Sequence, residues 1–316
     1  MYAPVQPMHI PDGFLSTLVS VVFWVISAIA VVYALRRVGK DLGERQVPLM
    51  GVLAAAIFAG QMLNFSVTGG TSGHLLGAAL TTILLGPYAA VIVLTSVVSI
   101  QALIFQDGGL LALGANLFNM AVVGVTVSYF VYTSIQKLAR GKSWGIFVGG
   151  ATAAWLSIVI ASLAAALELA LSGTSPANIS VPAMGGIHML IGIGEGLITI
   201  GALAFLYAAR RDLVRTSDTT PKGGAAVWTF GLGIALVLAV LSPLASTHPD
   251  GLEWVAGQQG FLEAARAPLY NVIPKYVFPG INNKAFATII AGILGTILVF
   301  GVALGVAYWR RKKETD

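Results

Sequence analysis

Residues 14–37 read Phe-Leu-Ser-Thr-Leu-Val-Ser-Val-Val-Phe-Trp-Val-Ile-Ser-Ala-Ile-Ala-Val-Val-Tyr-Ala-Leu-Arg-Arg, an apolar run that ends in two arginines. A helix needs about 20 predominantly apolar residues to cross the roughly 30 Å of hydrocarbon in a bilayer. The run before the arginines meets this length. It predicts a membrane-spanning helix near residues 14–35.

The composition of the whole chain agrees with this stretch. Of the 316 residues, 57% are hydrophobic and 10% are charged, and the mean hydropathy is +0.85. Soluble domains carry about 25% charged residues, so this chain is too apolar to cover a soluble surface. The sequence predicts an all-α, multi-pass protein of the cell (inner) membrane.

Similar runs predict about nine membrane-spanning helices. The expected spans are 14–35, 47–64, 74–87, 88–106, 110–135, 144–172, 184–209, 225–244 and 285–309. The third and fourth form one apolar stretch that Gly86-Pro87 divides, because proline disfavours helix in the residue before it. The last two spans flank a loop of about 40 residues, a length that is uncommon without a role.

Basic residues predict the orientation, because cytoplasmic loops are enriched in Lys and Arg. With nine spans and an external N-terminus, 15 of the 18 basic residues fall in cytoplasmic loops. They are Arg36, Arg37, Lys40, Arg45, Lys137, Arg140, Lys142, Arg210, Arg211, Arg215, Lys222, Arg310, Arg311, Lys312 and Lys313. The C-terminus is then cytoplasmic.

A polar, turn-rich linker near 210–224 divides the chain into two predicted modules. Residues 1–215 form a predicted seven-helix module, and 225–316 form a predicted two-helix module with the long external loop. Within the first, residues 1–7 have no evident role and are interpreted as a misassigned start or a removed extension. The second module is expected to contribute no geometry to a metal site, although Asp250 and Glu253 lie in its loop.

Charge and cysteine content exclude several classes of partner and site. The net charge of +5 is spread over short clusters between apolar runs and forms no continuous basic stripe, so no nucleic-acid partner is expected. The chain has no cysteine, which excludes thiolate metal sites and disulfides. Any metal must be bound by nitrogen or oxygen.

All four histidines fall on the predicted external side. His9 precedes the first helix, His74 opens the third, His188 opens the seventh, and His248 lies in the long loop. Histidine is the commonest metal ligand. The arrangement indicates a capture site for a divalent transition metal.

The stretch Met8-His9-Ile10-Pro11-Asp12-Gly13-Phe14-Leu15 offers a specific chelate. If the mature chain begins at Met8, its α-amine, the amide nitrogen of His9 and the imidazole Nδ1 of His9 place three nitrogens in a plane. His74 supplies a fourth. Square-planar nitrogen ligation favours Ni(II) or Cu(II) over zinc, which prefers a tetrahedron. The alternative is a start codon followed by an incidental polar residue.

The loop that carries His74 reads Asn64-Phe65-Ser66-Val67-Thr68-Gly69-Gly70-Thr71-Ser72-Gly73-His74. Its glycines allow sharp turns. Alternatively, His74 only donates a hydrogen bond to a carbonyl within a re-entrant loop. Asn64 and Ser72 are further candidates for positioning the ligands.

Four other polar positions draw attention. His188 and Glu195 are seven residues apart on one helix face, and a carboxylate inside a span is a functional candidate. Positioning a ligand through a hydrogen bond is favoured for both over direct ligation. Glu168 is expected at the membrane interface, Asn116 as a buried amide between helices, and residues 106–109 as an external turn.

Three motifs in order resemble a known family. They are Met8–Leu15, Thr68–Gly77, and Leu190-Ile191-Gly192-Ile193-Gly194-Glu195. Together they are similar to the substrate-binding M subunits of cobalt/nickel energy-coupling-factor (ECF) transporters, the CbiM/NikM family, over about residues 8–210. The stretch Pro249-Asp250-Gly251-Leu252-Glu253-Trp254 resembles the companion N component, as in fused M–N proteins.

The resemblance implies a function, partners and ligands. It implies a subunit that captures nickel or cobalt ions as substrate, without an organic cofactor, beside a transmembrane coupling subunit and two P-loop ATPases. It implies ligation by the amine of Met8, by His9 and by His74. The chain has no Walker A pattern, so the ATPase site lies elsewhere. By analogy, the fusion favours nickel.

Other functions stay open at this point. A cobalt importer that serves cobalamin biosynthesis is the nearest alternative. An intramembrane metalloenzyme built on His188 and Glu195 is disfavoured, because no His-Glu-x-x-His helix supplies paired ligands and a base. A self-sufficient secondary transporter is disfavoured too, because the basic residues avoid the spans.

Overall fold

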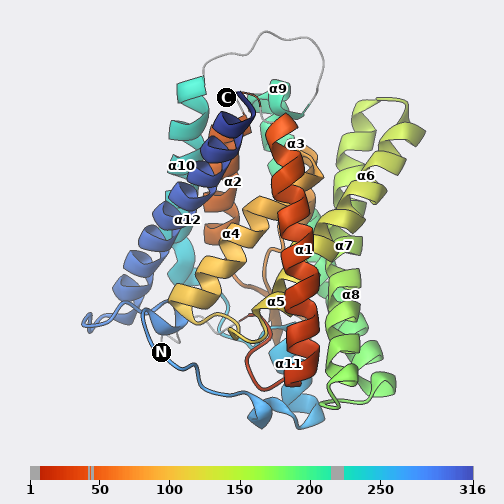
Figure 1. Cartoon of the computed structure of the whole chain (residues 1–316), viewed down its shortest axis with the longest axis vertical. Helices are drawn as coiled ribbons and strands as arrows, with labels where there is room; N and C mark the ends of the chain where they lie inside the picture. Colours follow the sequence, from red (N-terminus) through yellow and green to blue (C-terminus); the bar gives the residue numbers. More distant parts are fainter. Residues whose placement is uncertain (1–7, 42, 44–45, 215–223, 316) are drawn as a thin grey trace.

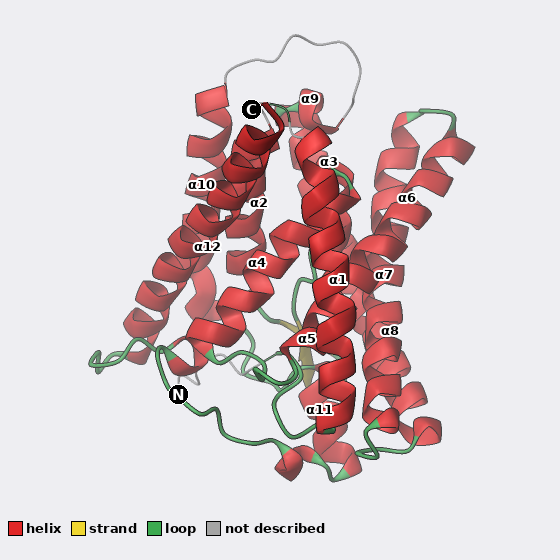
Figure 2. Cartoon of the chain, in the orientation of Figure 1, coloured by secondary structure: helices red, strands yellow, loops and turns green. Residues whose placement is uncertain are grey.

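The structure is a computed structural model that describes residues 8–41, 43, 46–214 and 224–315 of the chain. Helices dominate it, with one small pair of strands (Figure 2). The prediction of an all-α, multi-pass membrane protein is confirmed. The question of where the mature chain begins falls on residues 1–7, outside the described residues.

The helices follow the apolar runs of the sequence. They are α1 (Thr17–Asp41), α2 (Gln46–Gln61), α3 (Ala78–Leu85), α4 (Pro87–Phe105), α5 (Leu113–Leu117), the π-helix η1 (Phe118–Val123), α6 (Gly124–Ala139), α7 (Ser143–Leu171), α8 (Ala177–Ala209), α9 (Arg211–Val214), α10 (Gly224–Leu241) and α12 (Lys284–Thr315). Gly86 and Pro87 form the expected break, with Pro87 as the first residue of α4.

Within the described residues, six helices are long and apolar enough to cross a membrane. They are Thr17–Gly39, Pro87–Phe105, Leu113–Ala139, Ser143–Leu171, Ala177–Ala209 and Lys284–Lys313, beside the shorter apolar helices Gln46–Gln61 and Trp228–Leu244. The span expected at 74–87 is not a full helix. Only the eight residues of α3 are helical there, and they rise only about 12 Å.

The two ends of the molecule differ in charge. The α6–α7 turn with Arg140 and Lys142, the short helix α9, and the basic end of α12 lie at the same end in Figure 1, and α11 (Gly251–Gln259) lies at the other. The described basic residues of the α6–α7 turn, of α9 and of the end of α12 therefore share one end of the helix bundle. That this end faces the cytoplasm remains a prediction of the sequence.

A short hairpin precedes His74. Strands β1 (Phe65–Val67) and β2 (Thr71–Gly73) pair antiparallel, with Ser66 opposite Ser72. His74 therefore lies in an extended segment before α3 and does not open a helix. His188 does not open one either, because α8 already begins at Ala177.

The loop between α10 and α12, residues 245–283, is called the connector below. It contains α11 (Gly251–Gln259) and the 3-10 turns η3 (Leu262–Ala264) and η4 (Pro274–Tyr276), and η2 (Ser242–Leu244) precedes it. The amide of Ser72 donates to the carbonyl of Pro249 at 2.8 Å, and that of Ser246 donates to the carbonyl of Asn64 at 2.8 Å. The connector is thus bound to the hairpin of the first module by main-chain hydrogen bonds.

Close packing of α1 against α5 supports the segment that precedes α1. A Cβ added at Gly114 would lie 2.4 Å from the backbone nitrogen of Trp24, and the Ser27 hydroxyl donates to the Gly114 carbonyl at 2.7 Å. Backbone atoms cannot move aside as a flexible side chain can. Only glycine fits there without moving one helix.

Gly114→Ala is therefore expected to destabilise the protein by about 1–3 kcal/mol, the usual cost of overpacking. The measurement is thermal unfolding of the detergent-purified protein. Gly201→Ala is the control, since no atom lies within 4 Å of a Cβ added there, and alanine favours helix. Equal unfolding temperatures for the two variants would contradict this account of the α1–α5 contact.

Candidate metal centre

The segment before α1 is buried inside the bundle. Met8, His9 and Ile10 are 4%, 6% and 3% exposed. Asn116 of α5 holds the segment through two hydrogen bonds with the main chain of Ile10. The amide of Ile10 donates to Oδ1 of Asn116 at 3.0 Å, and Nδ2 of Asn116 donates to the carbonyl of Ile10 at 3.1 Å. Asn116 is buried as expected, but it joins a helix to this segment and not to another helix.

Asp107, immediately after α4, organises the same segment. The amide nitrogen of Met8 donates to its Oδ1 at 2.6 Å, and Nδ1 of His9 lies 3.2 Å from that oxygen. Nδ1 also lies 3.2 Å from the Asp107 carbonyl oxygen. Residues 106–109 lie in the non-helical segment between α4 and α5, as the sequence predicts for a turn, but Asp107 is buried within it and is only 1% exposed.

His74 lies beside His9. The centroids of the two imidazole rings are 5.7 Å apart, and the rings meet edge to face at 77°. Nδ1 of His74 lies 3.1 Å from the Leu75 carbonyl oxygen. Since a carbonyl only accepts, Nδ1 carries the proton and Nε2 keeps its lone pair. Nε2 of His9 is buried without a hydrogen-bond partner.

Glu195 of α8 holds the segment after His74. Its two carboxylate oxygens accept from the amides of Leu76 at 2.7 Å and Gly77 at 2.9 Å. Glu195 is fully buried, and main-chain donors satisfy its charge. It fixes the backbone next to His74 and does not line the inner cavity described next.

The inner cavity has a volume of about 80 Å³ and is lined by Met8, His9, His74, His188 and Asp250, among others. Nδ1 of His188 lies 2.8 Å from the Met184 carbonyl, so its Nε2 is also the unprotonated nitrogen. Three histidines from separate parts of the chain thus border one cavity.

Asn64 and Ser72 contact the connector. The Ser72 hydroxyl donates to the carbonyl of His248 at 2.9 Å. The main-chain carbonyl of Asn64 accepts from the amide of Ser246. Neither lines the inner cavity. They attach the connector above the hairpin. His248 itself is exposed.

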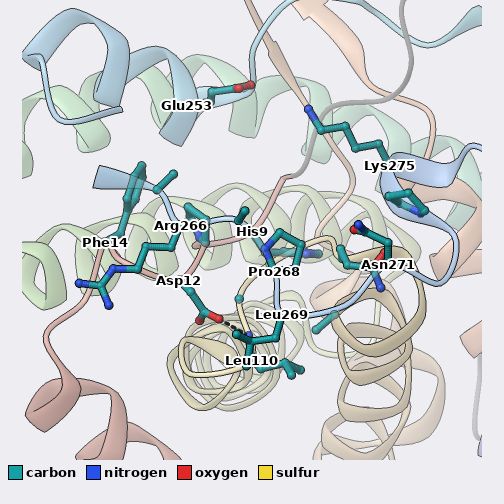
Figure 3. A pocket seen from close by; sticks show the side chains of 18 of the residues that line it. His9, Asp12, Phe14, Leu110, Glu253, Arg266, Pro268, Leu269, Asn271 and Lys275 are labelled. Carbon is teal, nitrogen blue, oxygen red and sulfur yellow. Dashed lines mark hydrogen bonds between the residues drawn. The ribbon is translucent and has the colours of Figure 1, made fainter. Parts of the chain in front are cut away.

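An outer cavity of about 510 Å³ lies between the connector and residues 9–14 and 106–110. Figure 3 shows His9 at its centre, with Asp12 and Leu110 on one side and Glu253 and Lys275 on the other. His9, Asp250 and Leu252 line both cavities. The expectation that Asp250 contributes nothing to the site geometry is therefore wrong, because the connector folds back over it.

Charge interactions distinguish the two histidines. Burial alone would lower the pKa of His9, but the charge and hydrogen bonds of Asp107 raise it above its ordinary value. Burial and the neighbouring His9 lower the pKa of His74 to about 4. Burial raises the pKa of Asp250 to about 8. His74 is therefore neutral at pH 7, with a lone pair available to a metal.

Glu168 differs from its expected interfacial position. It is 1% exposed, and its Oε2 accepts a hydrogen bond of 2.8 Å from Asn119 of the π-helix. Nothing in its local sequence indicates this partner, which lies 49 residues away. Among the residues with described positions, no three His, Asp or Glu side chains are placed to hold one ion together.

The fold and the site define a class: a multi-pass membrane protein with a buried cavity lined by imidazoles. The family model of the cobalt-uptake substrate-specific transmembrane region, CbiM, matches residues 9–213, and the PDGLE domain model matches residues 225–312. The chain belongs to the CbiM family, with a PDGLE domain after the family region.

Individual relatives agree. A NikMN protein of Archaeoglobus fulgidus is 39% identical over 96% of this chain and 98% of its own length. The fused nickel transport protein NikMN of Rhodobacter capsulatus is 30% identical over 94% of this chain and 96% of its own length. A crystal structure of a truncated transition metal transporter has a TM-score of 0.58 and 36% identity, and covers 64% of this chain and 99% of that one. This chain is therefore a membrane subunit of a metal transporter and not an enzyme.

Protons compete with a metal for His9, so retention of a metal should weaken as the pH falls through the raised pKa of His9. Asp107→Asn removes the charge that raises this pKa and leaves burial, which lowers it. The pH at which retention begins to fall should move down in this variant. Equilibrium dialysis with nickel between about pH 5 and 8 measures this. If nickel retention by Asp107→Asn began to fall at the same pH as in wild type, or at a higher pH, the role given to Asp107 would be contradicted.

Proposed function

We propose that this chain is the substrate-capturing membrane subunit of an ATP-driven ECF-type importer for nickel or cobalt ions. The observation that carries the proposal is the meeting of His9 and His74. Segments 65 residues apart in sequence bring two imidazoles to a centroid distance of 5.7 Å. Both rings border the same small cavity, and each Nδ1 faces a protein oxygen.

The proposed ligands are the Met8 amine, the amide nitrogen and Nδ1 of His9, and Nε2 of His74. Met8 N and His9 Nδ1 lie 2.6 and 3.2 Å from the same Asp107 oxygen, so both face one region. A bound ion takes the place of a proton on the Met8 amine, on the His9 amide and on Nδ1 of His9, whereas Nε2 of His74 already has a free lone pair. The set includes main-chain nitrogens, so it needs no cluster of acidic side chains. It requires a chain that begins at Met8, with a free amine.

Nickel is the favoured substrate. A planar set of four nitrogens suits Ni(II) by geometry. The fused relative of Rhodobacter capsulatus is named a nickel transport protein, and it shares the two-module arrangement along nearly its whole length. Cobalt is the alternative, because the family model is described as a cobalt-uptake region and a Geobacter sulfurreducens relative is named a cobalt transport protein. Cobalt uptake would serve cobalamin biosynthesis.

The proposal includes partners. A transmembrane coupling subunit and two P-loop ATPase subunits supply the energy, because no Walker A pattern occurs in this sequence. The proposed site borders Asp250, which caps α11, and α11 lies at the end of the bundle opposite α9 and the basic end of α12 (Figure 1). With α9 and that end of α12 in the cytoplasm, capture takes place on the external side.

His9→Ala and His74→Ala should each remove most nickel binding, because each deletes an imidazole from the shared cavity. His248→Ala should leave nickel binding near the wild-type level, since His248 is exposed and lies outside both cavities. Metal content of the purified variants and uptake of radiolabelled nickel and cobalt measure this. Normal nickel retention by His74→Ala would show that the site is wrongly assigned.

A further inference from the structure

Tyr276 in the connector has an unusual backbone. It has φ of 56°, and the preceding Lys275 has φ of 52°. Left-handed conformations are uncommon for residues other than glycine, and they persist where the surrounding structure enforces them. Here the conformation turns the ring into the protein, where Tyr276 is fully buried.

The ring and the hydroxyl of Tyr276 make separate contacts. The ring stacks on Phe105 at the end of α4, with centroids 4.7 Å apart and planes at 13°, and it also meets Phe58 of α2. The hydroxyl donates to Oδ2 of Asp107 at 2.6 Å. The ring thus anchors the connector, and the hydroxyl contacts a charged group.

The two oxygens of Asp107 therefore serve different modules. Oδ2 accepts from Tyr276 of the C-terminal module, whereas Oδ1 accepts from Met8 and lies next to His9. A carboxylate is planar, so fixing one oxygen fixes the direction of the other. Burial and the adjacent Asp107 hold the pKa of Tyr276 well above its ordinary value, so its hydroxyl keeps its proton.

We propose that Tyr276 is a positioning residue for metal capture, which orients Asp107 so that its other oxygen holds Met8 and His9 in place for the ion. The inference rests on the proposed function. It assigns the C-terminal module a direct part in building the site: the module supplies the donor that sets the position of the N-terminal ligands.

The test uses the chain that begins at Met8 and includes both modules, in detergent, because the proposed site needs the free amine of Met8. Titration calorimetry measures its affinity for nickel, and visible absorption reports the ligands of the bound ion. Tyr276→Phe keeps the ring and its stacking and removes only the hydroxyl. Nickel should bind about tenfold more weakly, the effect of losing one hydrogen bond to a charged group, and the absorption bands of bound nickel should shift. Tyr270→Phe, in the other tyrosine of the connector, should bind like wild type. Neither variant should unfold at a much lower temperature.

A double-mutant cycle separates positioning from general packing. If Tyr276 acts through Asp107, Tyr276→Phe should weaken binding by less than about twofold in an Asp107→Asn background. Full additivity, or wild-type affinity and spectrum for Tyr276→Phe, would overturn the inference while leaving the proposed function intact. A wild-type chain that binds neither nickel nor cobalt would instead overturn the proposed function.

Discussion

The carboxylate of Asp107 is the interaction on which the site depends. A buried charge is costly unless hydrogen bonds and an opposite charge compensate it. Here Met8, His9 and Tyr276 provide that compensation, and they come from both ends of the chain. Burial alone would raise the pKa of Asp107, yet His9 and these hydrogen bonds hold it below its ordinary value. The ionised carboxylate and its three partners therefore stabilise one another.

The two cavities indicate how an ion reaches the site. The outer one, at about 510 Å³, is large enough for a hydrated ion, whereas the inner one, at about 80 Å³, has room for few waters. His9 and Asp250 border both. A cation that moves inward must therefore exchange water for protein ligands at these residues. Asp250 comes from the connector and also caps α11 through the amide of Glu253 at 2.7 Å, so the C-terminal module forms part of this boundary.

Much of the fold could be predicted from sequence, because membrane spans depend on local composition. The apolar runs locate α1, α4 and α12, and the glycine-proline break before α4 is correct. His9 and His74 could be singled out because histidine is rare in this chain and chemically distinctive. Glu195 stands out in the sequence as a carboxylate inside a span, although its main-chain partners, Leu76 and Gly77, do not.

The roles of Asp107, Tyr276 and Asp250 could not be predicted, because each depends on contacts between distant segments. Asp107 stands in a glycine-rich stretch that resembles an ordinary turn, and Tyr276 lies 169 residues further along. The hairpin before His74 was missed because it consists of two three-residue strands. A short strand carries too little periodic signal to identify. Asp250 and Tyr276 of the connector are buried only through packing against the first module, and no local sequence pattern shows that contact.

The most direct test of the account is anomalous diffraction at the nickel absorption edge from crystals of the nickel-loaded chain. The account predicts a single strong peak between His9 and His74, at about 2.0–2.1 Å from a nitrogen of each, the usual length of a bond between a divalent metal and imidazole. The peak should also lie beside the nitrogen of Met8. A peak found only at His188, or only among connector residues in the outer cavity, would contradict the central claim that His9 and His74 share one ion.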